Sequence, residues 1–200
     1  MNIFSLSGVT QNKGACIQFL QEHGILHNPR VCPNNHPMTL QLRANGDRWR
    51  CRLRGCRSEF PLRNGTWLEG SRLPYRKIIL FIYCWSKEYT SINFTTQELG
   101  ISKETTIDYN NYLREVCAAD LLANPIIIGG PNTTVEVDES LFTRRKNNQG
   151  RVLPQQWVFG GWCRETRESF MYAVPDRTAA TLLPIIQACI RPGTTILSDS

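Results

Sequence analysis

Four side chains between residues 32 and 56 have the types and spacing of a metal site. Three residues separate Cys32 from His36, four separate Cys51 from Cys56, and fourteen lie between the two pairs. Thiolate and imidazole groups in two close pairs are typical ligands of small structural zinc sites. The pattern therefore predicts that these four residues bind Zn²⁺. The alternative is a hairpin with ordinary buried thiols.

Two aspartates near the other end of the chain have the chemistry to bind a different kind of metal ion. Asp138 follows the β-branched run Val135-Glu-Val, and Asp199 follows Thr195-Ile-Leu-Ser. Hard divalent cations prefer carboxylate oxygens on rigid elements, and pairs of such ions catalyse phosphoryl transfer. Two carboxylates at strand ends therefore predict a Mg²⁺ or Mn²⁺ site. For Asp138 alone, the alternative is an ordinary strand-end carboxylate.

Positive charge is concentrated in the middle of the chain. The net charge is +6, and residues 43–77 contain ten Lys or Arg against three acidic residues, so that segment carries +7 and the rest −1. Nine of the ten are arginines, whose planar fork can bond two phosphate oxygens. This predicts nucleic acid as a partner, and the alternative is a solvated face that keeps the protein soluble. The predicted DNA contacts in this segment are Arg48, Arg50, Arg52 and Arg54.

The composition is that of a globular protein, with 41% hydrophobic and 20% charged residues. The longest apolar run, Ile78–Trp85, is far shorter than the ~20 residues that a membrane-spanning helix needs. No secretory signal is visible, so we expect an intracellular location, the nucleus in a eukaryote, and no membrane partner. The eight cysteines should then be reduced thiols or metal ligands.

The predicted zinc ligands require a β-ribbon to hold them. Residues 1–29 predict a helical lead-in, and residues 30–63 predict a zinc-ribbon-like module. Residues 38–42 and 48–51 alternate as strands do, around a turn at residues 44–47. Such a module has too small a core to fold without its metal.

Residues 64–130 predict three helices arranged as in a helix-turn-helix. The first covers Pro74–Glu88, the short second begins at a capping box, Thr95–Glu98, and the third runs from Ser102 to about Leu122. This order favours a DNA-reading helix-turn-helix. The alternative is an ordinary helical bundle.

The third of these helices has two faces with different predicted roles. Its polar face supplies Lys103, Asn110 and Arg114 as predicted DNA contacts. Its apolar stripe is expected to be core and consists of Tyr109, Tyr112, Leu113, Val116, Cys117 and Leu121. Residues 129–131, Gly-Gly-Pro, then mark the start of a new domain.

Residues 131–200 predict the first part of an α/β domain. The expected elements are three strands, a helix and a strand, at residues 133–140, 156–163, 169–174, 178–190 and 195–199. With the fourth strand beside the first, these elements are the start of an RNase H-like fold. The predicted fold class is therefore α+β or α/β, with an N-terminal zinc β-ribbon, a helix-turn-helix-like segment and an incomplete RNase H-like catalytic domain.

Short motifs spread over the chain together match one family. In the last third they are Val135-Glu-Val-Asp-Glu-Ser, Arg145-Lys with Gly150-Arg, Trp157-Val-Phe-Gly-Gly with Arg164-Glu-Thr, Val174-Pro-Asp-Arg, and Pro192-Gly-Thr-Thr-Ile-Leu-Ser-Asp. Upstream they are Cys32-Pro, Met38, Trp49-Arg-Cys, Cys56 and the run Pro74–Trp85. With these motifs the chain resembles the DDE transposases of the Merlin type and their ISXO-type bacterial insertion-sequence relatives.

The resemblance implies cut-and-paste DNA transposition, in which metal-dependent phosphodiester hydrolysis is followed by strand transfer. It implies that Asp138 contacts two Mg²⁺ or Mn²⁺ ions and that Asp199 contacts one of them. It also implies that Lys146 and Arg151 shape a DNA-facing loop. Because transposases of this class act as paired protomers on two DNA ends, a homodimer is expected.

The chain departs from the family's pattern at two points. Asn35 stands where the family commonly has a cysteine, with His36 as the replacement ligand, and the family's third active-site residue lies beyond Ser200. The sequence therefore predicts an incomplete transposase-domain protein. The alternatives are a catalytically inactive, transposase-derived DNA-binding protein and an interaction module whose zinc ribbon binds protein.

Overall fold

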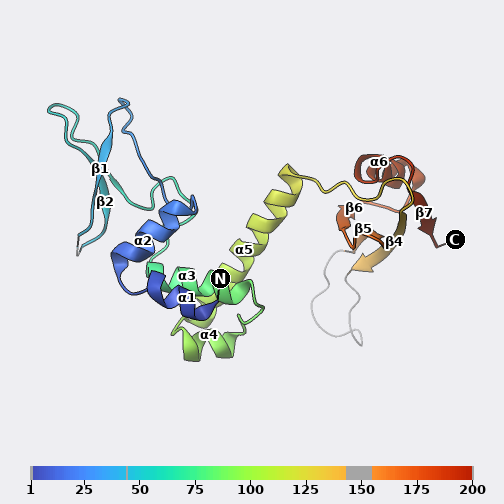
Figure 1. The fold of residues 1–200 in the computed structure, drawn as a ribbon, viewed down its shortest axis with the longest axis horizontal. Coiled ribbons are helices and arrows are strands. Elements are labelled where there is room, and N and C mark those ends of the chain that lie inside the picture. Colours follow the sequence, from blue (N-terminus) through green and yellow to red (C-terminus); the bar gives the residue numbers. More distant parts are fainter. Residues whose placement is uncertain (1, 44, 143–154, 200) are drawn as a thin grey trace. The chain divides into compact units, whose positions relative to one another are not determined.

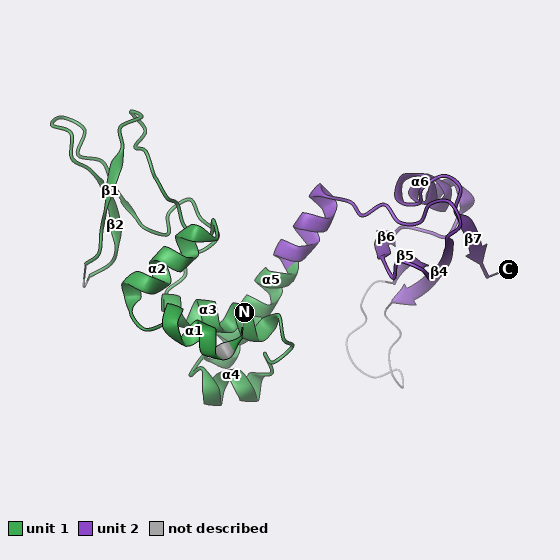
Figure 2. Ribbon diagram, viewed as in Figure 1, with its two compact units in different colours: residues 1–114 green, residues 115–200 purple. Residues whose placement is uncertain are grey.

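The structure is a computed structural model that describes residues 2–43, 45–142 and 155–199. It is a mixed α+β architecture with helices and two separate β-sheets (Figure 1). The chain divides into two compact units, residues 1–114 and 115–200 (Figure 2). Among the described residues, no helix has both the length and the apolar character needed to cross a membrane.

The sheet of the first unit has three short antiparallel strands in the order β1-β2-β3. They are β1 (Met38–Gln41), β2 (Arg48–Cys51) and β3 (Glu59–Pro61). The expected hairpin is confirmed, with Met38 opposite Cys51. The third strand was not predicted, because three residues are too few to show an alternating pattern.

In the described part of the chain, five helices belong wholly or partly to the first unit. They are α1 (Ile3–Val9), α2 (Lys13–Glu22), α3 (Tyr75–Trp85), α4 (Ile92–Glu98) and α5 (Lys103–Ala123), which continues into the second unit. Asn2 and Asn12 cap the first two helices through their side-chain oxygens. The sequence did not single out α1 as a helix, because its two serines and one glycine are weak helix formers.

One hydrophobic core joins the ribbon to the helices of the first unit. It includes Leu20 of α2, Cys51 of β2, Phe81 of α3 and Tyr109 of α5. The rings of Phe81 and Tyr109 meet edge to face with centroids 5.5 Å apart. The expected modules 1–29, 30–63 and 64–130 therefore share a core up to Leu113.

Helix α4 begins earlier than the sequence indicated. Its N-cap is Ser91, whose side chain accepts a hydrogen bond from the N–H of Phe94 at 3.3 Å. The expected capping box at Thr95–Glu98 is therefore wrong. Thr95 is instead buried inside the helix, where its hydroxyl lies 2.7 Å from the hydroxyl of Thr106 on α5. The Thr95 hydroxyl also bonds the carbonyl oxygen of Ser91, so burial leaves no unpaired polar group there.

The apolar stripe of α5 is only partly core. Tyr109 and Leu113 are buried, as expected. The other four residues of the stripe are exposed: Tyr112, Val116, Cys117 and Leu121. The prediction is wrong for these four, since the core of the first unit ends at Leu113. Periodicity identifies an apolar face, but the amount of it that is covered depends on tertiary packing.

The second unit has a four-stranded sheet in the order β6-β5-β4-β7. Its strands are β4 (Thr134–Phe142), β5 (Gln156–Cys163), β6 (Ser169–Val174) and β7 (Thr195–Ser198). β5 is antiparallel to both β4 and β6, whereas β7 is parallel to β4. The expected bounds of β5 and β6 and the pairing of the fourth strand beside the first are confirmed.

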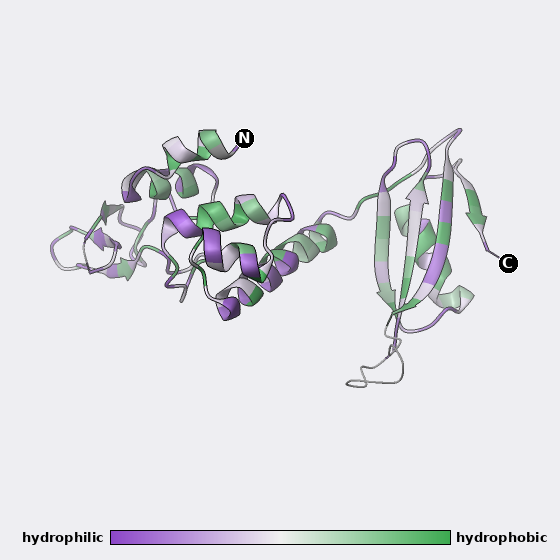
Figure 3. Cartoon of the chain, turned by 90° about the horizontal axis from the view of Figure 1, so that it is seen from below, coloured by the Kyte–Doolittle hydropathy of each residue, from purple (hydrophilic) through white to green (hydrophobic). Residues whose placement is uncertain are grey.

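Helix α6 (Ala179–Cys189) lies against one face of this sheet (Figure 3). The core between them is built around Val135, Phe159, Phe170 and Cys189. β5 must pass close to Phe170, because a Cβ on Gly161 would lie 2.5 Å from a ring carbon of Phe170. This close approach explains the glycine in the middle of a strand.

Candidate zinc centre and basic sheet face

The four predicted zinc ligands come together beside the three-stranded sheet. The ligand atoms of Cys32, His36, Cys51 and Cys56 all lie within 4.8 Å of one another. Two of the edges are 3.6 Å, between the sulfur atoms of Cys32 and Cys56, and 3.8 Å, between Cys51 Sγ and His36 Nδ1. A tetrahedral Zn²⁺ ion with Zn–S bonds of ~2.3 Å separates its ligand atoms by roughly 3.8 Å. The geometry therefore fits a metal ion such as zinc.

Backbone hydrogen bonds hold the first ligand pair in a tight loop. The N–H of Cys32 donates to the carbonyl oxygen of His36 at 2.9 Å, and the N–H of Asn35 donates to that of Cys32 at 2.8 Å. Asn35 has a φ of +59°, a left-handed conformation that asparagine adopts more readily than most residues. The turn at Asn35 thus places the side chain of His36 with the three cysteines of the cluster.

Polar neighbours that the sequence interpretation missed surround the sulfur atoms. The backbone N–H of His36 donates to Cys32 Sγ at 3.4 Å, and the side-chain amide of Asn34 donates to Cys56 Sγ at 3.6 Å. The hydroxyl of Ser58 lies 3.2 Å from the same sulfur of Cys56. Such partners orient metal ligands and stabilise thiolate charge. In the sequence, Ser58 could have been recognised as such a partner, because its hydroxyl comes two residues after Cys56.

The pKa values of two of these cysteines are shifted in opposite directions. The hydroxyl and N–H of Ser58, followed by the His36 ring, lower the pKa of Cys56 to about 5, which makes it a thiolate at neutral pH. The N–H of Leu53 lowers the pKa of Cys51, but burial and the sulfurs of Cys56 and Cys32 outweigh it, and the net shift is upward. A second thiolate beside that of Cys56 is disfavoured because the two negative charges repel each other. A bound divalent cation would offset this repulsion. This donor set matches the chemistry of Zn²⁺.

The sheet beside this cluster has one buried face and one arginine-rich face. Trp49 and Cys51 point to the core, so strand alternation places Arg48 and Arg50 on the opposite face. Arg52 and Arg54 follow in the loop between the ligands Cys51 and Cys56 and are exposed. All four arginines predicted to contact DNA therefore lie within three residues of Cys51 or Cys56 along the chain. We call Arg43, Arg48, Arg50, Arg52 and Arg54 the basic sheet face.

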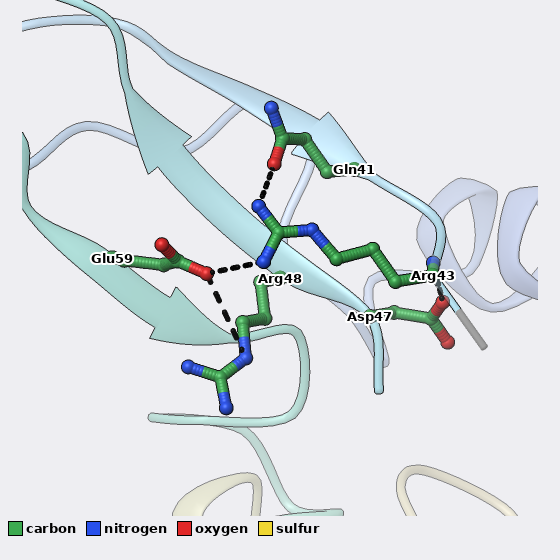
Figure 4. A network of polar contacts seen from close by, with 5 residues as sticks. All are labelled: Gln41, Arg43, Asp47, Arg48 and Glu59. Carbon is green, nitrogen blue, oxygen red and sulfur yellow. Dashed lines mark hydrogen bonds and ion pairs between the residues drawn. The ribbon is translucent and has the colours of Figure 1, made fainter. Parts of the chain in front are cut away.

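Glu59 partly neutralises the basic sheet face. Its Oε1 atom lies 2.9 Å from Nη1 of Arg43 and 3.7 Å from Nε of Arg48 (Figure 4). Gln41 accepts a further hydrogen bond from Arg43. Within the described part of the chain, Arg50, Arg52 and Arg54 have no such ion pair.

The residues of α5 that were predicted to contact DNA have mixed environments. Lys103 and Arg114 are exposed, and Arg114 donates to the Asn111 side chain at 3.2 Å. Asn110 is half-buried, accepts a hydrogen bond from the Thr90 hydroxyl at 2.8 Å and donates to the carbonyl of Thr106 at 2.9 Å. These bonds give Asn110 a structural role, fastening the segment before α4 to α5.

The charge of α5 also does not match that of a DNA-reading helix. Its two basic residues are outnumbered by four acidic ones, so its net charge is −2: Glu104, Asp108, Glu115 and Asp120. DNA phosphates repel such a surface. Positive charge is concentrated on the basic sheet face instead.

The two aspartates are neighbours in the second unit, although not as strand ends. Asp138 is the fifth of nine residues in β4, because pairing with β5 continues to Phe142 opposite Gln156. The prediction of a strand-end carboxylate is therefore wrong for Asp138. Asp199 does follow the end of β7. β4 and β7 are parallel with Val137 opposite Ser198, so the next residue of each is an aspartate.

A third carboxylate does not complete this pair. Glu136 shares the face of Asp138, but its carboxylate is bound by Arg164. In the described ranges, the one group of three or more potential ligand side chains is the Cys/His cluster. Lys146 and Arg151, which the resemblance placed in a DNA-facing loop, lie outside the described residues.

Comparison with known proteins finds a distant relative. The chain is 27% identical to the male abnormal protein mab-31 of Caenorhabditis elegans over 210 residues, an alignment that covers 90% of the chain. It covers 47% of that protein, so the chain spans about half the length of the curated relative it matches. No family model matches the chain. No solved structure matches it either. The chain is thus similar to part of a longer nematode protein.

Proposed function

We propose that the chain is a zinc-dependent DNA-binding protein with a transposase-like architecture. The observation that carries the proposal is the Cys/His cluster beside a sheet face lined with arginines. Zn²⁺ bound by Cys32, His36, Cys51 and Cys56 would supply a rigid crosslink rather than chemistry. The role of the ribbon is then to present guanidinium groups to DNA phosphates.

The position of the ligands connects zinc with DNA binding. Arg52 and Arg54 lie in the four-residue loop between Cys51 and Cys56, so a metal held by both cysteines fixes that loop at each end. Fixing the loop reduces the conformational entropy lost when the arginines bind phosphate. Arginine forks can each bond two phosphate oxygens.

The second unit supports the transposase-like part of the proposal. Its strand order, β6-β5-β4-β7 with β7 parallel to β4, is the order expected for the first four strands of an RNase H-like domain. Together with the sequence motifs, this order favours common ancestry with Merlin-type transposases. A DNA partner also implies an intracellular location, nuclear in a eukaryote, and the ancestry implies a homodimer.

DNA binding is tested on the zinc-loaded chain. We expect it to bind a labelled duplex of arbitrary sequence at low salt, because phosphate contacts provide affinity without sequence information. Fluorescence anisotropy measures the affinity, and the chain after zinc chelation is the matched comparison. Absence of binding at low salt refutes the proposal. Equal retention on immobilised DNA and on a neutral matrix would instead favour a protein-binding role for the ribbon.

A second candidate function is metal-dependent cleavage and joining of DNA by the second unit. The register that makes Asp138 and Asp199 neighbours favours it, since both would contribute to holding Mg²⁺ or Mn²⁺. Such ions, when bound, supply the positive charge that stabilises phosphoryl transfer. In this proposal, Asp138 and Asp199 would hold those ions at one face of the sheet.

Cleavage is tested with supercoiled plasmid and Mg²⁺ or Mn²⁺. We expect any metal-dependent nicking to be abolished in Asp138→Asn, because the amide carries no charge to hold the cation. Glu139→Gln is the matched control, since its carboxylate lies on the next position of β4 and pairs with Arg177 at 3.6 Å. Nicking that survives in Asp138→Asn would rule out Asp138 as the metal ligand.

A further inference from the structure

The first unit contains a cavity that none of the zinc ligands lines. It lies among the α1–α2 connection, the base of the ribbon and the segment that leads into α3, at residues 10–13, 16, 46–47, 61–63, 70–72 and 74–76. Its volume is about 750 Å³. That is within the range of small-molecule sites, roughly 300–1,000 Å³. The volume is sufficient for an anionic group together with bound water.

The lining of this cavity is strongly basic. Four cationic residues contribute to it: Lys13, Arg63, Arg72 and Arg76. The one acidic lining residue, Asp47, is already paired with Lys13 at 2.6 Å. The Asp47 side chain is only 3% exposed, so a ligand in the cavity would have little contact with its carboxylate. The cavity therefore has a net charge of +3.

Two of the arginines are available to a ligand, and a third is part of the wall. Arg63 donates to the carbonyls of Ser71 and, at 2.6 Å, Leu73, and its guanidinium lies 4.3 Å from the ring centroid of Tyr75. Arg72 and Arg76 are exposed and, within the described residues, have neither an ion pair nor a side-chain hydrogen bond. Their planar forks retain all their donors for a bound oxyanion.

The placement of Arg76 is unfavourable for the fold itself. It lies in the first turn of α3, where the helix dipole disfavours positive charge, and that turn contains no acidic residue. The N-cap, Pro74, provides no side-chain hydrogen bond. An anion in the cavity would offset this unfavourable charge. Solvation accounts for two exposed arginines, but both line this one cavity, and that placement favours an anionic ligand.

We propose that this cavity binds a phosphate group. Arg72 and Arg76 donate to its oxygens, and Arg63 adds positive charge at the cavity wall. The phosphate belongs either to a DNA backbone or to a small phosphorylated molecule, and both present the same tetrahedral oxyanion. The first source rests on the proposed DNA-binding function, whereas the site itself does not.

The test uses the full zinc-loaded chain and the double variant Arg72→Gln/Arg76→Gln. The charge-matched control is Lys87→Gln/Arg167→Gln, two exposed cations that do not line the cavity. Inorganic phosphate is expected to shift the backbone amide resonances of Lys13, Tyr75 and Arg76 saturably in wild type and control, and not in the cavity variant. The variant should melt no lower than wild type, because the replaced side chains have no partners. Absence of saturable shifts in the wild type overturns the proposal.

A labelled duplex then distinguishes the two sources. If a backbone phosphate occupies the cavity, the cavity variant weakens duplex binding more than the control and flattens the slope of log K against log salt by about one to two. If the variant and control bind duplex equally while inorganic phosphate still titrates, the ligand is a small phosphorylated molecule and the DNA source is rejected. Failure of the wild type to bind duplex rejects the proposed function. The titration with inorganic phosphate still decides whether the cavity binds phosphate.

Discussion

The Cys51→Ser variant is expected to lose its zinc and the structure of its ribbon. Cys51 is fully buried, lies opposite Met38 in the sheet and provides one of four ligand atoms. Serine leaves a hydroxyl that is a poor zinc ligand among apolar neighbours. Loss of a structural metal is among the few single changes that cost more than about 4 kcal/mol. Metal analysis should give about one zinc per wild-type chain and none for the variant.

The loss should be local to the ribbon at first. Helices α3 and α5 pack directly on each other through the rings of Phe81 and Tyr109, although these share a core with Cys51. Amide hydrogen exchange is therefore expected to lose its protection in β1, β2 and β3, with helical circular dichroism largely retained. Adding a chelator to the wild type should reproduce the same pattern, since structural zinc binding is coupled to folding.

Cys84→Ala is the matched control for this change. Cys84 is also buried, at 3% exposure, and lies on α3 outside the metal cluster. It should lower the melting temperature through lost packing but keep its zinc. Unchanged zinc content in Cys51→Ser, or equal zinc loss in both variants, would contradict the assignment of the cluster.

The Cys/His cluster could be predicted from sequence because its four residues are few, chemically distinctive and close along the chain. The Cys-x₃-His and Cys-x₄-Cys pairs needed only one hairpin to bring them together, and residues 38–51 showed its alternation and its turn. The neighbours that tune the site were less visible. The side chains of Ser58 and Asn34 contact Cys56 Sγ, and residue spacing along the chain does not predict how these side chains are oriented.

The helices show where sequence patterns stop being informative. Thr95 looked like a cap because threonine followed by glutamate three residues later is a capping signal, yet Ser91 begins the helix and Thr95 pairs with Thr106 in its interior. The choice between the two start sites depends on packing between α4 and α5. In the same way, a periodic stripe could not show that Tyr112 and Val116 would be exposed.

For the strands that carry the two aspartates, the sequence predicted which strands pair more accurately than it predicted where each strand ends. The parallel contact of β4 with β7 follows from the order of elements, since a helix between strands permits a parallel return. The end of β4 could not be derived in this way. It is set by β5, whose partner residues extend pairing to Phe142, well past Asp138.

Two changes on the basic sheet face are expected to move DNA affinity in opposite directions. Arg48→Gln/Arg50→Gln should weaken duplex binding roughly a hundredfold or more, because each of the two lost charge-assisted phosphate contacts costs about 1.5–3 kcal/mol. The slope of log K against log salt should flatten by about two. Glu59→Gln should strengthen binding and steepen the slope, since Arg43 and Arg48 lose the carboxylate that they share. Fluorescence anisotropy across a salt series measures both effects.

The strengthening by Glu59→Gln separates a local interface from a simple effect of net charge. Glu98→Gln removes the same charge from an exposed position on α4, away from the basic sheet face. If the face contacts DNA, Glu59→Gln tightens binding clearly more than Glu98→Gln, because beyond about 10 Å exposed charges are largely screened at ~0.1 M salt. Equal effects would mean that DNA senses only the overall charge and would remove the basic sheet face as the interface. Stability should change little in either variant, because surface ion pairs contribute about 0–1 kcal/mol. A difference in affinity then reports contact with DNA rather than a change in fold.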